Sequence, residues 1–324
     1  MPLAQSPIAS PFGHGTQAAE VVKGIDLKGK TAIVTGGSSG LGVETARALA
    51  SAGARVILPV RSREAAAADI RGSTGNKAVE VADMDLANWA SVRAFADAFV
   101  KTGSPLHILI NNAGIMATPE RRIMGDVESQ FGTNHLGHML LACRLAPALL
   151  KGAPSRVVCL SSVGHRIDMP SLDDPNFKKT PYDKWQAYGR SKSANVLFAV
   201  ELNRRLEGRL VNAYAVHPGG IMTNLQRDMS AEEIKRMGWI DETTGKPRDG
   251  FKTPAGGAAT AVWCATSPLL SAGGGVYCED CNIAEAVAYD SRAMNGVRPW
   301  AIDADKARQL WALSETMLGE TFGL

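Results

Sequence analysis

The stretch TAIVTGGSSGLGVETARALASAG, residues 31–53, contains the signals that decide the fold. Its first part, 31–36, is apolar and rich in β-forming side chains, which predicts a short buried strand. Residues 40–53 follow a helical apolar period that ends in glycine, which predicts a helix. The two elements are joined by a turn too short to be anything but a tight strand-to-helix connection.

That turn combines glycines spaced G-x3-G-x-G with two hydroxyl side chains: Gly36, Ser38, Ser39, Gly40 and Gly42. Glycines let the backbone approach a pyrophosphate closely, and the following helix points its positive N-terminus at the anion. A glycine cluster alone can be an ordinary turn. The strand before it and the helix after it favour a dinucleotide-binding site.

The same alternation continues outward from this stretch. Strands are predicted at 31–36, 54–60, 77–85, 106–114, 155–162 and 209–220, and helices at 40–53, 62–71, 87–103, 124–151 and 184–207. Strands that are apolar throughout and alternate with helices indicate a parallel sheet that is covered on both faces. The predicted fold class is α/β, a doubly wound Rossmann fold with a mostly parallel sheet in one domain.

The ends and interruptions of this pattern suggest the domain organisation. Residues 1–29 are rich in Pro, Gly, Ala and Ser and form an N-terminal extension, which either wraps the body or stays loose. Residues 30–324 form the dinucleotide-binding catalytic domain. Two segments break the alternation, 163–183 and 219–253, and both follow strand ends on the edge where ligands bind in open α/β sheets. We expect them to form the walls of a substrate pocket.

Composition excludes several classes of protein. The 324 residues are 45% hydrophobic and 21% charged, with a net charge of +3. Because the basic residues are scattered, nucleic-acid binding is not expected. No apolar run is long enough to span a membrane, and the first residues lack the basic and apolar regions of a secretory signal.

Five cysteines point to a reducing environment. They are odd in number and mostly lie in apolar runs, at Cys143, Cys159, Cys264, Cys278 and Cys281. Reduced thiols in a cytoplasmic protein fit this pattern best. The CEDC motif at 278–281 lacks a second pair or nearby histidines, so no metal site is expected.

Small polar residues recur at the predicted strand ends. The motif NNAG (111–114) ends the fourth strand, Ser161 and Ser162 end the fifth, and HPGG (217–220) with Thr223 follows the sixth. Each is more often a turn former. Together, beside a glycine-rich loop, they form a constellation on one sheet edge.

Asn134 lies inside the helical run FGTNHLGHMLL, where asparagine is a poor helix former and either bends the helix or serves a site. His135 and His138 are three residues apart but lack acidic or cysteine partners, so packing is favoured over metal binding.

Tyr188 and Lys192, in AYGRSKSAN, are four residues apart in a predicted helix and therefore share one face. A charge ~5 Å away at an effective dielectric of about 20 is worth roughly 3 kcal/mol. We therefore expect the lysine to lower the pKa of the phenol toward neutrality, where it can exchange a proton with a substrate oxygen. A surface packing contact is the simpler interpretation of such a pair on its own.

In this order and at these separations, TGGSSGLG, NNAG, Asn134, Ser162, YGRSK and HPGG resemble the short-chain dehydrogenase/reductase family, from about residue 28 to the C-terminus. The elements FGTNHLGHML, SSVGH and LWALSETMLG are most similar to its retinol dehydrogenase and WW-domain oxidoreductase branch. Protochlorophyllide oxidoreductases share GTNHLGH.

The resemblance implies a reaction and a set of roles. Tyr188 would protonate the carbonyl oxygen, Lys192 would lower the pKa of Tyr188 and hold the nicotinamide ribose, Ser162 would bind the substrate oxygen, and Asn134 would position a relay water. Hydride comes from the cofactor. The implied cofactor-binding residues are Gly36, Ser38, Ser39, Gly40, Leu41, Gly42, Arg61, Asp85, Leu86, Asn112, Ala113, Gly114, Tyr188, Lys192, Pro218, Gly219, Ile221 and Thr223. It also implies a homodimer or homotetramer built on the helices at 124–151 and 184–207.

The tip of the second strand, ILPVRSR, predicts NADP(H) over NAD(H). NAD selectivity requires an acidic side chain there, and the aligned position is Val60. The next residue, Arg61, can bind a 2′-phosphate through charge-assisted hydrogen bonds. Pro59 interrupts the strand, Arg63 adds a nearby cation, and Asp85 is expected at the adenine edge.

Three functions follow from these patterns. The first is an NADP(H)-dependent oxidoreductase that acts on a small-molecule carbonyl or alcohol. The second is a redox regulator that binds the cofactor without turnover, although such proteins usually lack the tyrosine or the lysine, and the third is a light-dependent pigment reductase.

Overall fold

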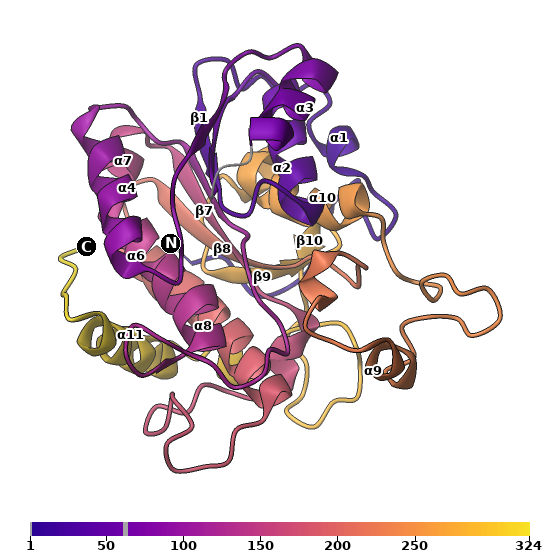
Figure 1. The fold of residues 1–324 in the computed structure, drawn as a ribbon. Helices are drawn as coiled ribbons and strands as arrows, with labels where there is room; N and C mark the ends of the chain where they lie inside the picture. The colour runs from indigo at the N-terminus through magenta and orange to yellow at the C-terminus, as the bar shows by residue number, and fades with distance from the viewer. Residues whose placement is uncertain (1, 61–63) are drawn as a thin grey trace.

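The computed structural model describes residues 2–60 and 64–324, and an eight-stranded sheet runs through its centre (Figure 1). The strand order is β10-β9-β8-β7-β4-β1-β2-β3. Within this sheet the pairings are parallel except for β10, which is antiparallel to β9. The predicted doubly wound fold is confirmed. β1 pairs with β2 on one side and β4 on the other, which creates the switch point where such sheets bind ligands.

The strands are short and mostly buried. They are β1 Thr31–Val34, β2 Arg55–Pro59, β3 Val79–Ala82, β4 Ile108–Asn111, β7 Ser155–Leu160, β8 Val211–His217, β9 Val276–Glu279 and β10 Asn282–Ile283, with a separate hairpin of β5 Arg122–Ile123 and β6 Val127–Glu128. Every residue of β1 and β4 is buried, as expected for strands that are apolar on both faces.

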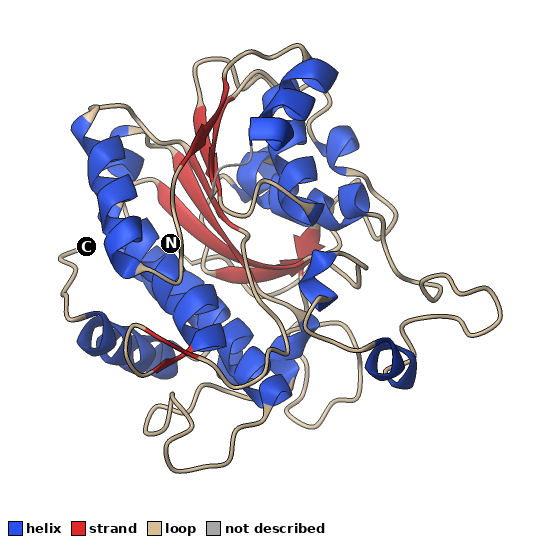
Figure 2. Ribbon diagram, in the orientation of Figure 1, coloured by secondary structure: helices blue, strands red, loops and turns tan. Residues whose placement is uncertain are grey.

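Helices cover both faces of the sheet (Figure 2). One apolar layer contains side chains of α4, α6, α7, α8 and α11, and the other contains side chains of α1, α2, α3 and α10. The bounds are α1 Ala18–Val21, α2 Gly40–Ser51, α3 Glu64–Thr74, α4 Trp89–Lys101, α5 Ser129–Phe131, α6 Gly137–Arg144, α7 Ala146–Lys151, α8 Lys184–Arg205, α9 Ala231–Arg236, α10 Pro254–Thr266 and α11 Ala304–Leu318.

The helix predicted at 124–151 begins later than expected, at Ser129. Met124 and Gly125 both have positive φ and form the turn of the β5–β6 hairpin, so no helix can start there. Glu128 then caps α5 by accepting from the amides of Gln130 and Phe131. A π-helical turn, Gly132–Leu136, separates α5 from α6.

The helix pair on which a subunit interface was expected is partly covered by the chain itself. α11 packs along α8, and the Trp311 ring stacks on Phe198 with centroids 5.8 Å apart. Ser314 of α11 bonds the ring of His135, and Glu320 pairs with Arg144. This packing covers part of α8, and a subunit interface on the helices at 124–151 and 184–207 stays a prediction.

The N-terminal extension lies along the β9–β10 edge. The Gln5 side chain donates to the carbonyl of Tyr277 and accepts from its amide, both at 2.9 Å. Asn282 makes the same reciprocal pair with the backbone of Ile8. Of the two alternatives, the described part of the extension follows the first and wraps the body.

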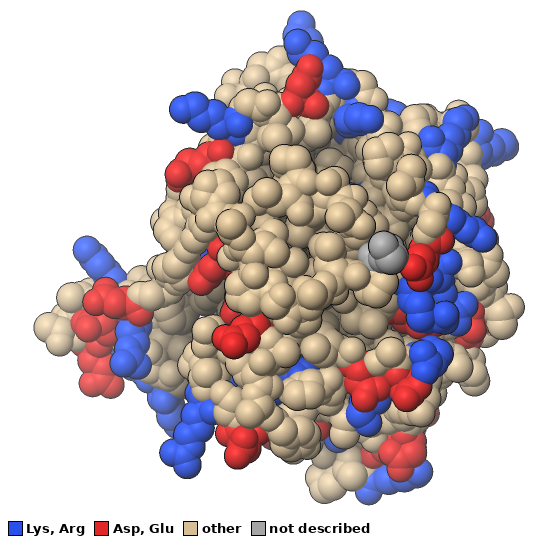
Figure 3. Space-filling model, turned by 180° about the vertical axis from the view of Figure 1, so that it is seen from behind, with Lys and Arg blue, Asp and Glu red and all other residues tan. Residues whose placement is uncertain are grey.

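The surface carries mixed charges. On the face shown in Figure 3, basic and acidic side chains alternate around the rim and the centre is mostly uncharged. Within the described residues no helix combines the length and apolar character that crossing a membrane requires.

Candidate active site

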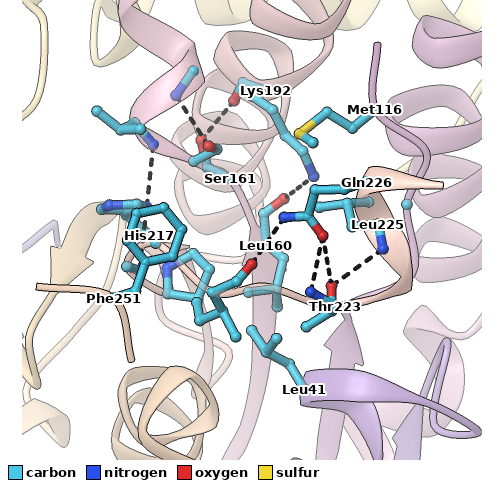
Figure 4. Close-up of a pocket in the computed structure, with 18 of the residues that line it drawn as sticks. Leu41, Met116, Leu160, Ser161, Lys192, His217, Thr223, Leu225, Gln226 and Phe251 are labelled. Atoms are coloured by element: carbon cyan, nitrogen blue, oxygen red, sulfur yellow. Dashed lines mark hydrogen bonds between the residues drawn. The ribbon is translucent and has the colours of Figure 1, made fainter. Parts of the chain in front are cut away.

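A cavity of about 1200 Å³ opens where the carboxyl ends of β1, β4, β7 and β8 meet. The described structure brings most of the predicted site residues to its wall: Gly36, Ser39, Gly40, Leu41, Asn112, Ala113, Gly114, Ser162, Tyr188, Lys192, Pro218, Gly219, Ile221 and Thr223. Figure 4 shows Leu41, Leu160, Lys192, His217 and Thr223 arranged around this cavity on separate parts of the chain.

The glycine-rich turn forms a cradle that side chains would fill. A Cβ on Gly42 would lie 2.2 Å from the carbonyl oxygen of Gly36, and one on Gly36 would lie 2.9 Å from the Cα of Ala113. Gly36 and Gly40 also adopt positive φ, which favours glycine. Ser39 begins α2 without a side-chain cap, so the first amides of the helix remain for a ligand. This arrangement fits a pyrophosphate.

Thr35 fixes the neighbouring NNAG turn. Its hydroxyl oxygen accepts from the amides of Asn112 and Ala113 at 2.8 and 3.0 Å. The Asn112 side chain donates back to the Thr35 carbonyl at 2.8 Å. Thr35 is fully buried, and the sequence analysis did not identify it.

His138 connects this turn to Asn134. Its Nδ1 lies 2.9 Å from the Asn134 carbonyl, and its Nε2 lies 2.9 Å from the Thr35 hydroxyl. A carbonyl can only accept, so Nδ1 carries the proton and Nε2 accepts from Thr35. Burial lowers the pKa of His138 to about 4, which keeps the ring neutral. The prediction that His138 is a packing residue is therefore incomplete, because its ring also links Thr35 to Asn134 by hydrogen bonds.

Asn134 lies in the π-helical turn and is fully buried. Its side-chain amide donates to the Ile115 carbonyl at 2.9 Å and to Ser191 Oγ at 3.0 Å, and its oxygen accepts from the Ile115 amide at 2.9 Å. The side chain therefore joins the turn after β4 to α8.

Tyr188 and Lys192 share one face of α8, as predicted, and Lys192 Nζ lies 5.6 Å from the centre of the Tyr188 ring. The predicted fall in the pKa of Tyr188 is wrong. Burial raises that pKa to about 12, and a hydrogen bond with Ser162 opposes the rise only partly. Burial also lowers the pKa of Lys192 to about 8. Desolvation is the largest cause of both shifts.

The two serines after β7 have different surroundings. Ser161 is buried and donates to the Lys192 carbonyl at 2.8 Å, so it fixes α8 to the sheet. Ser162 Oγ accepts from the Gly164 amide at 3.0 Å and also bonds Tyr188. His165 Nδ1 lies 2.7 Å from the Ser162 carbonyl and donates to it, which fixes the backbone of this residue.

The loop after β8 closes over the glycine-rich turn. The Thr223 methyl lies 3.4 Å from where a Cβ on Gly40 would be. Gly219 has φ +97°, and a side chain there would clash with Lys252, whose ammonium pairs with Asp280 at 2.6 Å. His14 of the N-terminal extension contacts the same carboxylate at 3.4 Å. Lys252, Asp280 and His14 carried no recognisable signal in the sequence.

The expected pocket segments contribute unequally. From 219–253, Leu225, Trp239 and Phe251 line the cavity, and Glu233 bonds both Lys184 and the indole nitrogen of Trp185. From 163–183, only the first residues, through Ile167, reach the wall. A segment that the pattern did not suggest adds Met294, Asn295 and Arg298.

Several predicted cofactor contacts lie away from this wall. The Asp85 carboxylate accepts from the Ala87 amide at 3.0 Å, and Leu86 packs against Gly137. Ser38 and Gly42 belong to the cradle but do not line the cavity. Arg61 and Arg63 lie outside the described residues.

The cysteines are all free and buried. The thiol of Cys278 neighbours Cys264, whereas Cys281 contacts the Thr260 hydroxyl at 3.9 Å. Within the described part of the chain no three His, Cys, Asp or Glu side chains are grouped to hold a metal ion.

Comparisons with known proteins agree with this geometry. The family model for the short chain dehydrogenases matches residues 30–234. A "probable oxidoreductase" from Streptomyces lividans is 42% identical over 291 residues, which cover 89% of this chain and 97% of that protein. Retinol dehydrogenase 11 from Mus musculus is 40% identical over 301 residues, covering 91% and 88%.

Solved structures are similar as well. An uncharacterized protein from Mycobacterium paratuberculosis superimposes with a TM-score of 0.72 at 35% identity, covering 96% of this chain and 100% of that one. The NADP active-site complex of Pseudomonas aeruginosa RhlG superimposes with a TM-score of 0.59 at 25% identity, covering 78% and 95%.

Proposed function

This chain belongs to the short-chain dehydrogenase/reductase family, and we propose that it transfers a hydride between NADP(H) and a small-molecule carbonyl or alcohol. The predicted similarity to the retinol dehydrogenase branch is confirmed by the mouse relative. One observation supports the proposal most directly. Tyr188, Lys192 and Ser162 lie in the same cavity as the glycine cradle, so the acid–base groups and the cofactor site face one space.

The cradle and its neighbours fit a dinucleotide. Gly36–Gly42 would hold the pyrophosphate, Asn112–Gly114 and the loop from Pro218 to Thr223 would enclose the nicotinamide half, and Lys192 would bind its ribose. When bound, the cofactor supplies or accepts the hydride. The chain's own contribution is orientation and the movement of one proton.

Tyr188 is the proposed proton donor. Because burial raises its pKa to about 12, the phenol keeps its proton at neutral pH and can donate it to a carbonyl oxygen. Ser162 bonds the phenol and would bind the same substrate oxygen. Lys192, with a pKa of about 8, is mostly protonated at pH 7 and would stabilise the tyrosinate. Asn134 would position a water for return of the proton, and its three hydrogen bonds supply the rigidity this requires.

The preference for NADP(H) over NAD(H) rests on the tip of β2. Val60 is buried and apolar, so it cannot accept from ribose hydroxyls. Arg61 follows it in the sequence and would bind the 2′-phosphate. The NADP complex of the similar RhlG structure supports the same choice.

The cellular setting is proposed from the cysteines. Five buried, unpaired thiols are typical of a reducing compartment such as the cytoplasm. A homodimer or homotetramer built on the helices at 124–151 and 184–207 stays a prediction, and α11 covers part of α8.

The test is NADPH consumption by wild type and Tyr188→Phe with a panel of aldehydes, ketones, steroids, retinoids and aromatic alcohols. We expect at least one substrate in the dark, and a loss of at least about 10²-fold in kcat in the variant. NADPH binding should stay near normal, because the phosphates are held by the cradle. Turnover only under illumination would favour pigment reduction, and cofactor binding without any turnover would favour a redox regulator.

A further inference from the structure

Two arginines that line the cavity are held by the backbone around Ser162. Arg166 ends the 3-10 turn Val163–Arg166 directly after that serine, and Arg298 comes from the segment before α11. The Arg298 amide donates to His165 Nε2 at 3.2 Å, and Nδ1 of the same ring bonds the Ser162 carbonyl. Both arginines are thus fixed to the backbone that carries the proposed oxygen-binding serine.

The two cations lie close together, and neither is paired with a carboxylate within the described residues. Both guanidinium groups donate to the same acceptor, the Ser291 carbonyl, Arg166 at 3.2 Å and Arg298 through Nη2. Burial, and then the charge of Arg298, lower the pKa of Arg166. Throughout residues 2–60 and 64–324, neither guanidinium forms an ion pair with a carboxylate.

The nearest acidic groups are engaged otherwise. Glu279 faces Arg166 at a distance, but its carboxyl accepts from the Gly296 amide at 2.7 Å, and burial raises its pKa. Asp280 is paired with Lys252 and His14. This part of the cavity therefore keeps an excess of positive charge, although Arg298 is only 4% exposed.

A purely structural explanation is that the arginines clamp the 285–298 loop through its carbonyls. Neutral donors would do this without the cost of burying two like charges. These contacts also leave one hydrogen-bond donor unsatisfied, because Nε of Arg166 is buried and has no acceptor in the described structure. An anion between the two groups would remove the repulsion and take up the free donor.

We propose that Arg166 and Arg298 bind an anionic group of the substrate, so that the preferred substrate is an oxo acid or hydroxy acid. This inference rests on the proposed function and specifies its substrate class. The planar guanidinium suits a carboxylate, which it can bind through two parallel hydrogen bonds.

The rest of the wall offers apolar surface, most of it packed around Tyr188. Met116, Trp185, Leu225, Trp239 and Phe251 line the cavity, and the rings of Trp185 and Trp239 meet edge to face at 6.1 Å. Apolar surface of this kind binds chain or ring carbons. The structure thus favours an amphipathic molecule with its carbonyl at Tyr188 and its acid at the arginines.

The kinetic test uses a series of ω-oxo acids of rising chain length, each beside its neutral methyl ester. In wild type, kcat/KM for the acid of matching length should exceed that of its ester by about 10- to 150-fold. Arg166→Gln should remove most of this ratio, and Arg166→Lys should restore part of it. Arg292→Gln is the matched control, since Arg292 lies exposed in the same loop but does not line the cavity. Esters turned over as well as acids at every length would overturn the proposal.

A binding test works without turnover. Medium-chain fatty acids and their primary amides are titrated into the NADPH-saturated protein while the tryptophan fluorescence, to which Trp185 and Trp239 of the cavity wall contribute, is followed. The acid should bind at least about tenfold more tightly than the amide, and Arg166→Gln should erase the difference. Equal affinity refutes the anion site. If no oxo compound is reduced but acids still bind selectively, the proposed reaction fails and the site stands. Arg298→Gln is a second variant, to be used only if its unfolding midpoint matches wild type.

Discussion

Replacing His138 is predicted to weaken cofactor binding, although the ring lies beneath the cavity wall and does not line it. Its Nε2 accepts a hydrogen bond from the Thr35 hydroxyl. The oxygen of that hydroxyl in turn accepts hydrogen bonds from the backbone amides of Asn112 and Ala113. An asparagine amide reaches the position of Nδ1 and a glutamine amide reaches that of Nε2. His138→Asn should therefore keep the bond to Asn134 and lose the bond to Thr35, and His138→Gln should do the reverse.

The magnitudes follow from the contacts. A buried neutral hydrogen bond is worth about 0.5–1.5 kcal/mol, and a buried group left without a partner costs about 1–3 kcal/mol. The Thr35 hydroxyl has a second acceptor in the Ile110 carbonyl at 3.3 Å, which offsets part of the loss. We expect either variant to lose about 1–3 kcal/mol of unfolding free energy. Only His138→Asn should raise the Kd of NADPH, by about fivefold, or roughly 1 kcal/mol.

The assay pairs urea unfolding with NADPH titration, and His135 provides the control. It is buried like His138 but bonds Ser314 on α11, away from the cofactor turn. His135→Asn and His135→Gln should lower stability and leave the Kd of NADPH unchanged. If His138→Asn and His138→Gln bind NADPH equally well, the proposed bridge through Thr35 is wrong.

Three further predictions concern other parts of the molecule. Burial lowers the pKa of five histidines: His107, His135 (to about 3), His138 (to about 4), His165 (to about 4) and His217 (to about 3). Because a depressed pKa stabilises the fold only while the ring is neutral, stability should be full above about pH 6.5 and fall as the pH drops, by about 1.4 kcal/mol per pH unit per histidine down to each folded pKa. A urea midpoint equal at pH 7 and pH 5 would contradict this. Arg61→Ala should cost NADPH binding roughly 1.5–3 kcal/mol and erase most of an at least tenfold preference over NADH, whereas equal wild-type affinities would disprove the assignment. Hydrogen exchange in 219–253 should slow when cofactor and substrate are both bound, because Leu225, Trp239 and Phe251 line the cavity and would pack on the bound substrate. Unchanged exchange would argue against a lid.

Sequence patterns predicted the elements whose burial is local and regular. β1 and β4 are apolar at consecutive positions, and the glycine-rich turn between β1 and α2 has a spacing that few other structures require. α10 and α11 were not predicted. α10 is small-residue-rich and buried almost all round, so it lacks a polar face to define a period. β9 follows three glycines, which weakens any strand signal.

The site residues were found where a motif marks a strand end and missed where only tertiary packing brings them in. Thr35 and His138 act through hydrogen bonds between positions 103 residues apart. Arg298 reaches the wall from a segment without regular structure, and His14 from the N-terminal extension. None of these contacts has a period or a spacing, so no local pattern could reveal them.

The error on Tyr188 shows what spacing can and cannot predict. Four residues along a helix place Lys192 beside the phenol, and the structure confirms this proximity. The sign of the pKa shift depends on desolvation, which is set by β7, α8 and the cavity together. Because both groups are buried, the phenol keeps its proton at neutral pH, whereas the ammonium of Lys192 gives up its proton more easily than a lysine in water. In the direction of carbonyl reduction the protonated phenol is the useful state, because it already holds the proton that it must donate. In the direction of alcohol oxidation the same phenol must first be deprotonated, so oxidation should require a higher pH than reduction.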